Sequence, residues 1–359
     1  IGRLIHQLPE KLCEMFLDEV FEGNAAGSFD NLEVGKYKIT ATLSDGTTEK
    51  KKVEKTINIK NLDDMSAYLF VHFVDTQEDA TREQIYFSVS KDGKTWTTLN
   101  NKQPYLTSNV GTQGVRDPYI LRGEDGKFFI IATDLSVYNL KNNWTAAAQQ
   151  GSKSIVVWES SDLVNWSEAS LVKINNDNAG CTWAPEACYD PEKDEYMVFW
   201  ASVVSDDSYQ KYRIYRSYTK DFKTFSAPEL YIEEPNAVID TTIIDHEGTY
   251  YRFTKNEAKS SITMQECTSL SGDWKDVANY NLGSMTGYEG PTIYKLNGKN
   301  EWCLLLDYFS KSKGYKPFVT TDITKGEFTA DSDFSFDGTY RHGTVMPITQ
   351  AEYERLTAE

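Results

Sequence analysis

The feature that most constrains the fold of this chain is a repeated β unit. Short runs rich in aromatic and β-branched residues are followed by an aspartate and then by an aromatic residue. Close copies, with a four-residue step, lie at residues 90–96, 161–166 and 220–225, and looser copies lie at 268–274 and 321–328. A carboxylate can close a turn on backbone N–H groups while the aromatic residue packs on the sheet. A repeat of this kind predicts a series of similar β units that bury their apolar faces against one another.

A second repeated feature is a set of five β runs that carry an ionisable residue at or near the start. They are RDPYIL at 116–121, WAPEAC at 183–188, VIDTTI at 238–243, YEGPTI at 288–293 and RHGTV at 341–345. A turn and a strongly apolar run follow each of the first four. No strongly apolar run follows the fifth, whereas the apolar run AYLFVHF at 67–73 has no run with an ionisable start before it. Joining the two ends completes a fifth unit, which predicts an all-β fold, a five-bladed β-propeller whose last blade is closed by both ends of the chain.

The N-terminal part of the sequence reads as a separate, smaller unit. Residues 24–59 suggest a few strands around an Asp-Gly turn, and a polar stretch at 60–66 follows them. We expect residues 1–66 to form a small β-rich ancillary domain, similar to Ig-like modules, and residues 67–359 to form the propeller and catalytic domain. One short helix is expected near residues 10–21. Sugar binding, a spacer and a structural clamp all remain open as roles for this ancillary domain.

Charge and composition exclude several classes of function. The chain has 54 acidic and 37 basic side chains, a net charge of −17, which argues against nucleic acid or an anionic membrane as a partner. No apolar stretch reaches the length of a membrane-spanning helix. The five cysteines are widely spaced without a CxxC motif, which disfavours a disulfide framework and a zinc site. We expect a monomer.

The propeller prediction brings distant ionisable residues together. Five inner strands around one axis would place the residues at their starts together at one end of the central tunnel, which we call the mouth. These residues are Asp117, Glu186, Asp240, Glu289 and His342. A group of carboxylates over a narrow pocket suits hydrolysis of a glycosidic bond, since one must accept a proton from water and another must protonate the leaving oxygen. A third carboxylate nearby can raise the pKa of the proton donor.

With these motifs in this order, residues 67–356 resemble glycoside hydrolase family 43, five-bladed propellers that act on arabinose- and xylose-containing polysaccharides. The resemblance implies that Asp117 is the general base, Glu289 the general acid and Glu186 the residue that modulates the pKa of the acid. At Glu186 the sequence departs from the family, which more often has Asp in this motif. The family is inverting, which predicts that the Asp117 and Glu289 carboxyls lie roughly 6.5–9.5 Å apart.

The resemblance also implies a metal-linked role for one residue. His342 matches a histidine near the propeller axis that is associated, through water, with a structural Ca²⁺ ion. Because Ca²⁺ prefers oxygen ligands, a direct bond to the imidazole would be atypical. The alternative for His342 is a histidine satisfied by hydrogen bonds on the inner strand.

Candidate substrate-binding residues lie beside the proposed catalytic heads. Trp183 and Tyr288 are candidates for the walls of a sugar pocket, with packing as the alternative for each. Arg341 could clamp sugar hydroxyls or pair with one of the acids. Asp240 is expected to be an axial structural acid or a sugar contact.

Other aromatic residues lie away from these heads. We expect six tryptophans to pack between blades: Trp96, Trp158, Trp166, Trp200, Trp274 and Trp302. The polar insert at 138–150 departs from the blade rhythm and places Trp144 near the mouth as a candidate aromatic platform.

The expected function is an inverting glycoside hydrolase that removes terminal α-L-arabinofuranosyl units from plant cell-wall polysaccharide or oligosaccharides. A β-D-xylosidase of the same family is the first alternative, and a non-catalytic carbohydrate-binding propeller is an alternative of another class. A retaining fructan-cleaving enzyme is disfavoured because no NDPNG-like segment precedes Asp117. The sequence leaves arabinofuranose, xylose and galactofuranose, and exo or endo action, undistinguished. The expected partner is an arabinose- or xylose-containing glycan, and that substrate class suggests a secreted or bacterial cell-surface location.

Overall fold

The computed structural model describes residues 13–16, 35–44, 49–59, 65–74 and 79–358. The chain divides into two compact units, and the larger one contains residues 63–188 and 196–359. No helix among the described residues is long and apolar enough to cross a membrane.

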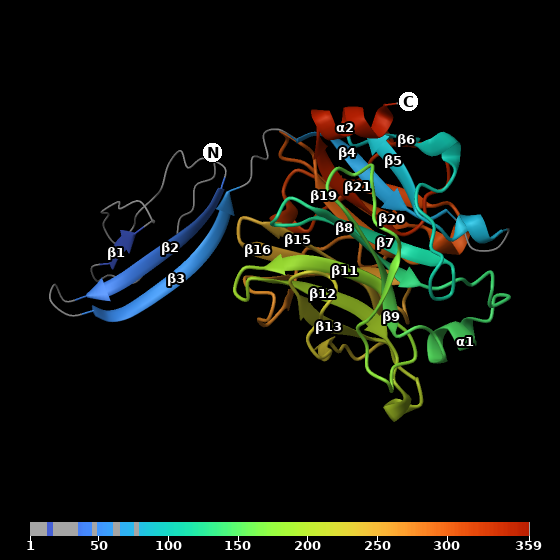
Figure 1. Cartoon of the computed structure of the whole chain (residues 1–359), viewed down its shortest axis with the longest axis horizontal. Helices are drawn as coiled ribbons and strands as arrows, with labels where there is room; N and C mark the ends of the chain where they lie inside the picture. Colours follow the sequence, from blue (N-terminus) through green and yellow to red (C-terminus); the bar gives the residue numbers. More distant parts are fainter. Residues whose placement is uncertain (1–12, 17–34, 45–48, 60–64, 75–78, 359) are drawn as a thin grey trace. The chain divides into compact units, whose positions relative to one another are not determined.

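The smaller unit contains one antiparallel sheet of order β1-β2-β3, formed by β1 (Cys13–Phe16), β2 (Gly35–Ser44) and β3 (Glu49–Ile59) (Figure 1). The two longer strands confirm the expected strands, and the turn between them lies outside the described residues. The helix expected near residues 10–21 is wrong at Cys13–Phe16, because these residues pair with Thr40–Leu43 of β2. Pairing with a sheet edge supplies backbone hydrogen bonds that override local helix propensity. The ancillary role and exact boundary of this part stay predictions.

Four of the sheets in the larger unit are four-stranded antiparallel blades built from consecutive strands. The first has β7 (Val115–Arg122), β8 (Phe128–Asp134), β9 (Ser154–Ser160) and β10 (Ser170–Lys173). The second has β11 (Trp183–Asp190), β12 (Glu195–Ser202), β13 (Arg213–Thr219) and β14 (Glu229–Ile232). The third has β15 (Val238–His246), β16 (Thr249–Asn256), β17 (Ser261–Cys267) and β18 (Lys275–Asp276). The fourth has β19 (Glu289–Lys295), β20 (Trp302–Asp307), β21 (Tyr315–Thr320) and β22 (Thr329–Ala330).

The fifth sheet joins the two ends of the propeller, in the order β23-β6-β5-β4-β24. Its strands are β4 (Met65–His72), β5 (Tyr86–Ser90), β6 (Thr95–Thr98), β23 (Ser335–Phe336) and β24 (Gly343–Thr349). The C-terminal strand β24 pairs antiparallel with β4, with Gly343 opposite His72. The predicted five-bladed β-propeller, closed by both ends of the chain, is confirmed.

Helical segments are short and lie in the connections between strands, except for α2, which follows the closing strand. They are α1 (Trp144–Gln149) and α2 (Gln350–Thr357), with 3-10 turns at Ala80–Arg82, Asn100–Lys102, Ser205–Asp207, Phe309–Lys311 and Ile323–Lys325. Thr349 and Glu352 form a capping box at the start of α2. Arg122 of β7 also donates to both carboxylate oxygens of Glu352, at 2.7 and 2.8 Å. The segment that follows the closing strand is thereby tied to the first blade.

The repeated aspartates act as the sequence predicts, by closing turns. Asp162 accepts hydrogen bonds from the backbone N–H groups of Val164 and Asn165 at 3.0 and 2.7 Å. Asp92 does the same for Lys94 and Thr95, at 2.8 and 2.7 Å. The hydrogen bonds of Asn165 to Asp162 lower the pKa of that carboxyl to about 2.

The core lies between the blades, where large aromatic residues fill the space. Four of the tryptophans expected to pack there are almost fully buried: Trp96, Trp158, Trp200 and Trp302. Trp166 and Trp274 are half-buried against the same kind of cluster. The inner strands of neighbouring blades contact one another around the propeller axis. Strand β19 contacts β15 and β24, and β24 also contacts β7.

Candidate active site

The starts of the inner strands share an unusual backbone conformation. Asp117, Ala184, Asp240 and Gly290 have φ angles of 50, 47, 50 and 51°, in the left-handed region. Three of these positions coincide with a break in strand register, in β7, β15 and β19. A bulge of this kind bends the strand and redirects its side chains. For a residue other than glycine this conformation costs about 1–2 kcal/mol, so the packing of the blades must stabilise it.

Glycine is required at one of these bulges. A Cβ atom on Gly290 would lie 2.7 Å from Cγ of His342. The imidazole of His342 therefore occupies the space that a side chain at residue 290 would need. Close approach of these two strands places His342 among the acids of the neighbouring blades.

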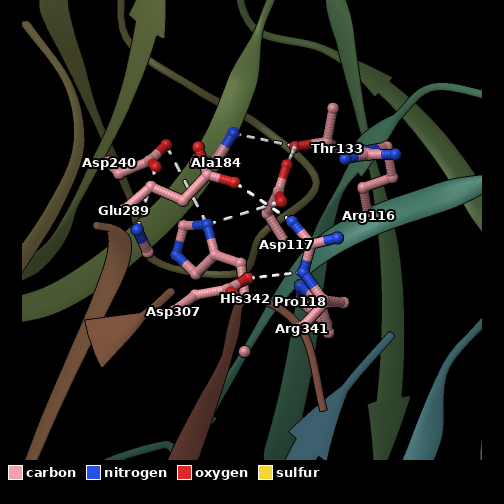
Figure 2. A network of polar contacts seen from close by, with 12 residues as sticks. Arg116, Asp117, Pro118, Thr133, Ala184, Asp240, Glu289, Asp307, Arg341 and His342 are labelled. Carbon is pink, nitrogen blue, oxygen red and sulfur yellow. Dashed lines mark hydrogen bonds and ion pairs between the residues drawn. The ribbon is translucent and has the colours of Figure 1, made fainter. Parts of the chain in front are cut away.

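His342 lies between two of the predicted acids (Figure 2). Its Nδ1 atom is 3.4 Å from Oδ1 of Asp117 and 3.9 Å from Oδ1 of Asp240. Burial alone would lower the pKa of His342, but the charges of Asp240 and Asp117 outweigh it and raise that pKa to about 9. The imidazole is therefore a cation that holds two carboxylates together at neutral pH.

Asp117 is fixed by contacts on both of its oxygens. Its Oδ2 accepts a hydrogen bond from Oγ1 of Thr133 at 2.9 Å, and Thr133 in turn accepts one from the backbone N–H of Ala184 at 2.7 Å. Burial would raise the pKa of Asp117, but the hydrogen bond and charge of His342 hold it below its ordinary value. The side chain is 15% exposed. Asp117 is thus an ionised, oriented carboxylate with access to the mouth.

Asp240 is buried more deeply and differs in its protonation. Its Oδ2 accepts from the backbone N–H of Gly290 at 3.0 Å. Burial raises the pKa of Asp240 to about 6, although the charges of His342 and Lys255 oppose that shift. This contact links β15 to β19, as expected for an axial structural acid, and its contact with sugar stays a prediction.

Glu289 lies at the centre of a row of alternating charges. Its Oε1 is 3.2 Å from Nη2 of Arg341, and its Oε2 is 2.9 Å from Nζ of Lys255. The row continues at one end to Glu257, 2.8 Å from Lys255 Nζ, and at the other to Asp307, 2.6 Å from Arg341 Nε. The Glu289 side chain is 21% exposed. Like Asp117, it is a firmly positioned carboxyl that a substrate can reach.

Two deeply buried members of this row, Lys255 and Asp307, have perturbed pKa values. Burial would lower the pKa of Lys255, but the charges of Glu289, Asp240 and Glu257 raise it above its ordinary value. Burial raises the pKa of Asp307 to about 6, although Arg341 opposes that shift. Lys255 is therefore a permanent cation whose side chain is only 3% exposed.

Glu186 is the least accessible of the three predicted catalytic carboxyls, with the whole residue 3% exposed. Burial raises its pKa to about 8, against the opposing charge of His342 and a hydrogen bond with Thr242. Its Oε2 atom has no hydrogen-bond partner among the described residues. Glu186 is thus a carboxyl held neutral near pH 7, next to the axial cluster.

The predicted substrate-binding residues have mixed surroundings. Arg341 pairs with Glu289 and Asp307, as one of its two expected roles requires. Tyr288 is mostly buried and stacks on Tyr308, with ring centroids 4.5 Å apart. This contact supports packing for Tyr288, and its role in a sugar pocket stays a prediction.

Trp183 is more open than Tyr288. It is half-buried and stacks on Tyr212, with ring centroids 5.3 Å apart, while its edge meets Trp144 at 6.2 Å. It belongs to an aromatic group that extends from the start of β11. Sugar contact by Trp183 stays a prediction.

Sequence reasoning missed three functional candidates: Thr133, Lys255 and Asp307. Each lies at or near the end of the second strand of its blade, paired with the start of the inner strand; for example, Asp307 is opposite Glu289. Antiparallel pairing returns the end of that strand to the mouth. A polar residue that ends an otherwise apolar second strand was the signal that could have identified them.

The axial residues do not fit a directly bound Ca²⁺ ion. Within the described part of the chain, no group of three or more His, Cys, Asp or Glu side chains has the arrangement of a metal site. Nδ1 of His342 already faces Asp117 and Asp240, so this atom is not available to a metal ion. An ion linked through water stays a prediction, and the chemistry below does not use it.

Comparisons with known proteins agree with this geometry. A family model described as a probable glycosyl hydrolase domain, related to glycoside hydrolase family 43, matches residues 63–354. An α-L-arabinofuranosidase from Bifidobacterium longum subsp. longum is 30% identical over 342 residues, covering 82% of this chain and 31% of that protein. The chain thus spans about a third of the length of this curated relative.

Solved structures with a similar fold are more distant. A family 43 protein from Bacillus licheniformis is 17% identical with a TM-score of 0.49, covering 79% of this chain and 56% of that one. An exo-β-1,3-galactanase from Phanerochaete chrysosporium is 17% identical with a TM-score of 0.46, covering 63% of this chain and 53% of that one.

Proposed function

This chain belongs to the glycosidases of the glycoside hydrolase family 43-related group, and from that premise we propose that it removes terminal α-L-arabinofuranosyl units from a plant cell-wall glycan by a single displacement. The observation that carries the proposal is the pair Asp117 and Glu289. Both carboxyls reach the mouth, and both are held by charged neighbours from other strands.

Asp117 is proposed as the general base. A base must be ionised at the working pH and must be oriented toward the water that it activates. His342 lowers the pKa of Asp117, and Thr133 fixes its second oxygen. Asp117 can therefore accept a proton from water on one face of the anomeric carbon.

Glu289 is proposed as the general acid that protonates the leaving oxygen. Both of its oxygens face cations, Arg341 on one side and Lys255 on the other. The oxygen that carries the transferred proton must face the leaving oxygen of the substrate, so the mechanism requires the contact between that oxygen and its cation to open when substrate binds. Glu257 gives Lys255 a second partner that stays available during this change.

Glu186 is proposed to act on the acid through Asp240 and not by direct contact with substrate. Its main electrostatic neighbours are His342 and Asp240, whereas Asp240 and Asp307 are the carboxyls that feel the charge of Glu289. A protonated Glu186 removes one negative charge from the cluster. The axial charge that faces Glu289 is then set by Asp240.

The choice of sugar is supported by one relative. The similarity to the α-L-arabinofuranosidase from Bifidobacterium longum supports arabinofuranose as the sugar that this chain releases. The similarity covers 31% of that protein. β-D-Xylosidase activity is the alternative within the same chemistry. The polymeric substrate also underlies our proposal of a secreted or bacterial cell-surface location.

Two nitrophenyl glycosides separate these possibilities. We expect release of nitrophenol from the α-L-arabinofuranoside, little release from the β-D-xyloside, and arabinose as the product from arabinan and arabinoxylan. Preferred release of nitrophenol from the β-D-xyloside, with xylose as the product from xylo-oligosaccharides, would show that the substrate is a xyloside. The proposed roles of Asp117 and Glu289 would not change. Binding of these glycans without any hydrolysis would favour the sugar-binding alternative and reject the proposed catalysis.

A further inference from the structure

The segment between β8 and β9, residues 138–150, carries aromatic side chains that the proposed mechanism does not use. Tyr138 and Trp144 are 42% and 43% exposed, and they are the aromatic members of the large exposed apolar side chains in the described part of the chain. The segment contains a single charged residue, Lys141, and is rich in Asn and Gln. Exposed rings beside neutral amides match the chemistry of a sugar more closely than that of a charged ligand.

The segment is held in place and is not a loose loop. Asn143 caps α1 by accepting from the backbone N–H of Ala146 at 3.0 Å, and Ala147 is fully buried in a small apolar cluster with Leu135 and Val137. At the start of the segment, the backbone N–H of Tyr138 donates to the buried Glu83 carboxylate at 3.1 Å. A ring on such a support loses little conformational freedom when a ligand binds.

Trp144 is also linked through a series of contacts to the proposed acid, and it lies against the residue that precedes the proposed base. Its ring lies 5.2 Å from the guanidinium carbon of Arg116, the residue before Asp117 in the chain. The same guanidinium lies 4.5 Å from the ring of Phe73, and the guanidinium carbon of Arg341 lies 5.8 Å from that ring. Arg341 in turn contacts Glu289. These contacts form a continuous line from the exposed ring to the proposed acid.

Arg116 is fixed in this line by charge. Its Nη1 atom is 3.1 Å from Oε1 of Glu83, whose side chain is fully buried. Trp144 also makes an edge-to-face contact with Trp183, the first residue of β11. Trp144 therefore lies against residues at the starts of two inner strands, β7 and β11.

We propose that Trp144 forms a binding subsite for a sugar ring of the glycan main chain, on the leaving-group side of the bond that is cleaved. The apolar face of the sugar stacks on the exposed indole, and amides of residues 138–150 are available to its hydroxyls. The subsite lets the enzyme recognise a chain to which the terminal unit is attached, in addition to that unit itself. This inference rests on the proposed glycosidase function.

The test measures glycan binding separately from turnover. Trp144→Ala and Trp144→Phe are made in the active protein and in the Asp117→Asn background, in which binding can be followed by calorimetry without hydrolysis. Leu230→Ala is the matched control, because Leu230 is 47% exposed on β14, outside the segment. Arabinoxylan and arabinan oligosaccharides are the probes, with methyl α-L-arabinofuranoside as a ligand that lacks a main chain.

We expect Trp144→Ala to weaken oligosaccharide binding and raise KM by about tenfold, the scale of one lost ring contact, with a much smaller change in kcat. Trp144→Phe restores most of the binding, and the loss is larger for oligosaccharides than for the methyl glycoside. Leu230→Ala leaves every value unchanged.

The outcomes separate this inference from the proposed function. Unchanged oligosaccharide binding and KM in Trp144→Ala overturn the subsite, even if the parent hydrolyses arabinosides. Weakened glycan binding in Trp144→Ala, in a protein that hydrolyses no pentoside, rejects the proposed function and overturns the placement beside a cleaved bond, while it keeps Trp144 as a sugar-binding residue. A loss of self-association in Trp144→Ala, with glycan binding intact, would assign the ring to a contact between copies of the chain and overturn the inference.

Discussion

The carboxylates of the blade turns and those of the propeller axis are the same residue types in opposite environments. In the turns, Asp162 and Asp92 accept backbone N–H groups and their pKa values fall to about 2. At the axis, burial raises the pKa of Asp240 to about 6 and that of Glu186 to about 8. The turn acids are satisfied by their own local backbone, whereas the axial acids depend on groups from other strands, several of them in other blades. Burial and charged neighbours that shift pKa values in opposite directions are typical of functional sites, and they occur here at the axis.

The largest expected difference between the two regions is in turnover. Asp117→Asn should lower kcat by about 10³-fold or more, because the amide cannot take a proton from water, while the melting temperature stays near that of the parent. Asp162→Asn is the matched control at a blade turn and should keep full activity. Equal activity of the two variants, measured on an arabinofuranoside, would remove the distinction on which the proposed function depends.

A second test uses the pH dependence of stability at the axis. The pKa of Glu186 is raised in the folded protein, so the stability linked to its proton is fully present below about 4.5 and is lost as the pH rises through about 8. The stability of Glu186→Gln should not depend on this ionisation. As the pH rises from about 4.5 to about 8, the variant should therefore become more stable than the parent, by on the order of a few kcal/mol.

Denaturant unfolding at pH 4.5 and pH 8.5 measures this gain. Asp162→Asn is the control, because the pKa of Asp162 is lowered to about 2 and its pH-dependent contribution is lost only as the pH falls from its ordinary value through about 2, which is outside this range. Parallel pH profiles for the parent and Glu186→Gln would show that Glu186 is not held neutral by burial.

The third expected effect concerns the buried cation that contacts Glu289. Lys255→Met keeps the apolar part of the side chain but removes the charge and the contact to Oε2, and a misplaced acid should lower kcat by roughly 100-fold. Lys255→Arg should recover part of that loss, with KM nearly unchanged in both variants. Lys223→Met, at an exposed blade turn, is the control. A fall in stability without a fall in kcat would assign Lys255 a structural role alone.

The smallest expected effect is at a blade turn. Asp162→Ala removes an acceptor for two backbone N–H groups and should lower the free energy of unfolding by about 1 kcal/mol, without changing kcat. Urea unfolding and an activity assay measure both quantities. A loss of activity in the folded variant would mean that the turns and the axis are not separable.

The same comparison explains how much the sequence could predict. Turn aspartates leave a local pattern, an aspartate four residues before an aromatic residue, and this pattern predicted the blades. The inner run that became β24 lacks an apolar run after it, and the apolar run that became β4 lacks an inner run before it. These two gaps predicted that both ends of the chain close one blade, and β24 does pair with β4. Local patterns of this kind are sufficient because four of the blades are built from consecutive strands and the fifth joins the strands at the two ends of the propeller.

The axial site was only partly predictable, because its contacts join strands from different blades. Asp117 and Glu289 were predicted because each lies at the start of an inner β run in the repeat. Lys255 and Asp307 were missed, since their role depends on the register between the first and second strands. The left-handed bulges at Asp117 and Asp240 were also invisible, because no glycine marks them.

The stereochemistry of the first product tests the division of roles between Asp117 and Glu289 most directly. Proton NMR of an α-L-arabinofuranoside during early hydrolysis distinguishes the anomer that forms first from the one that appears by mutarotation. The account predicts that β-L-arabinose appears first, because water activated by Asp117 attacks opposite the bond that Glu289 protonates. First appearance of the α anomer would require a covalent intermediate on the protein and would contradict the account.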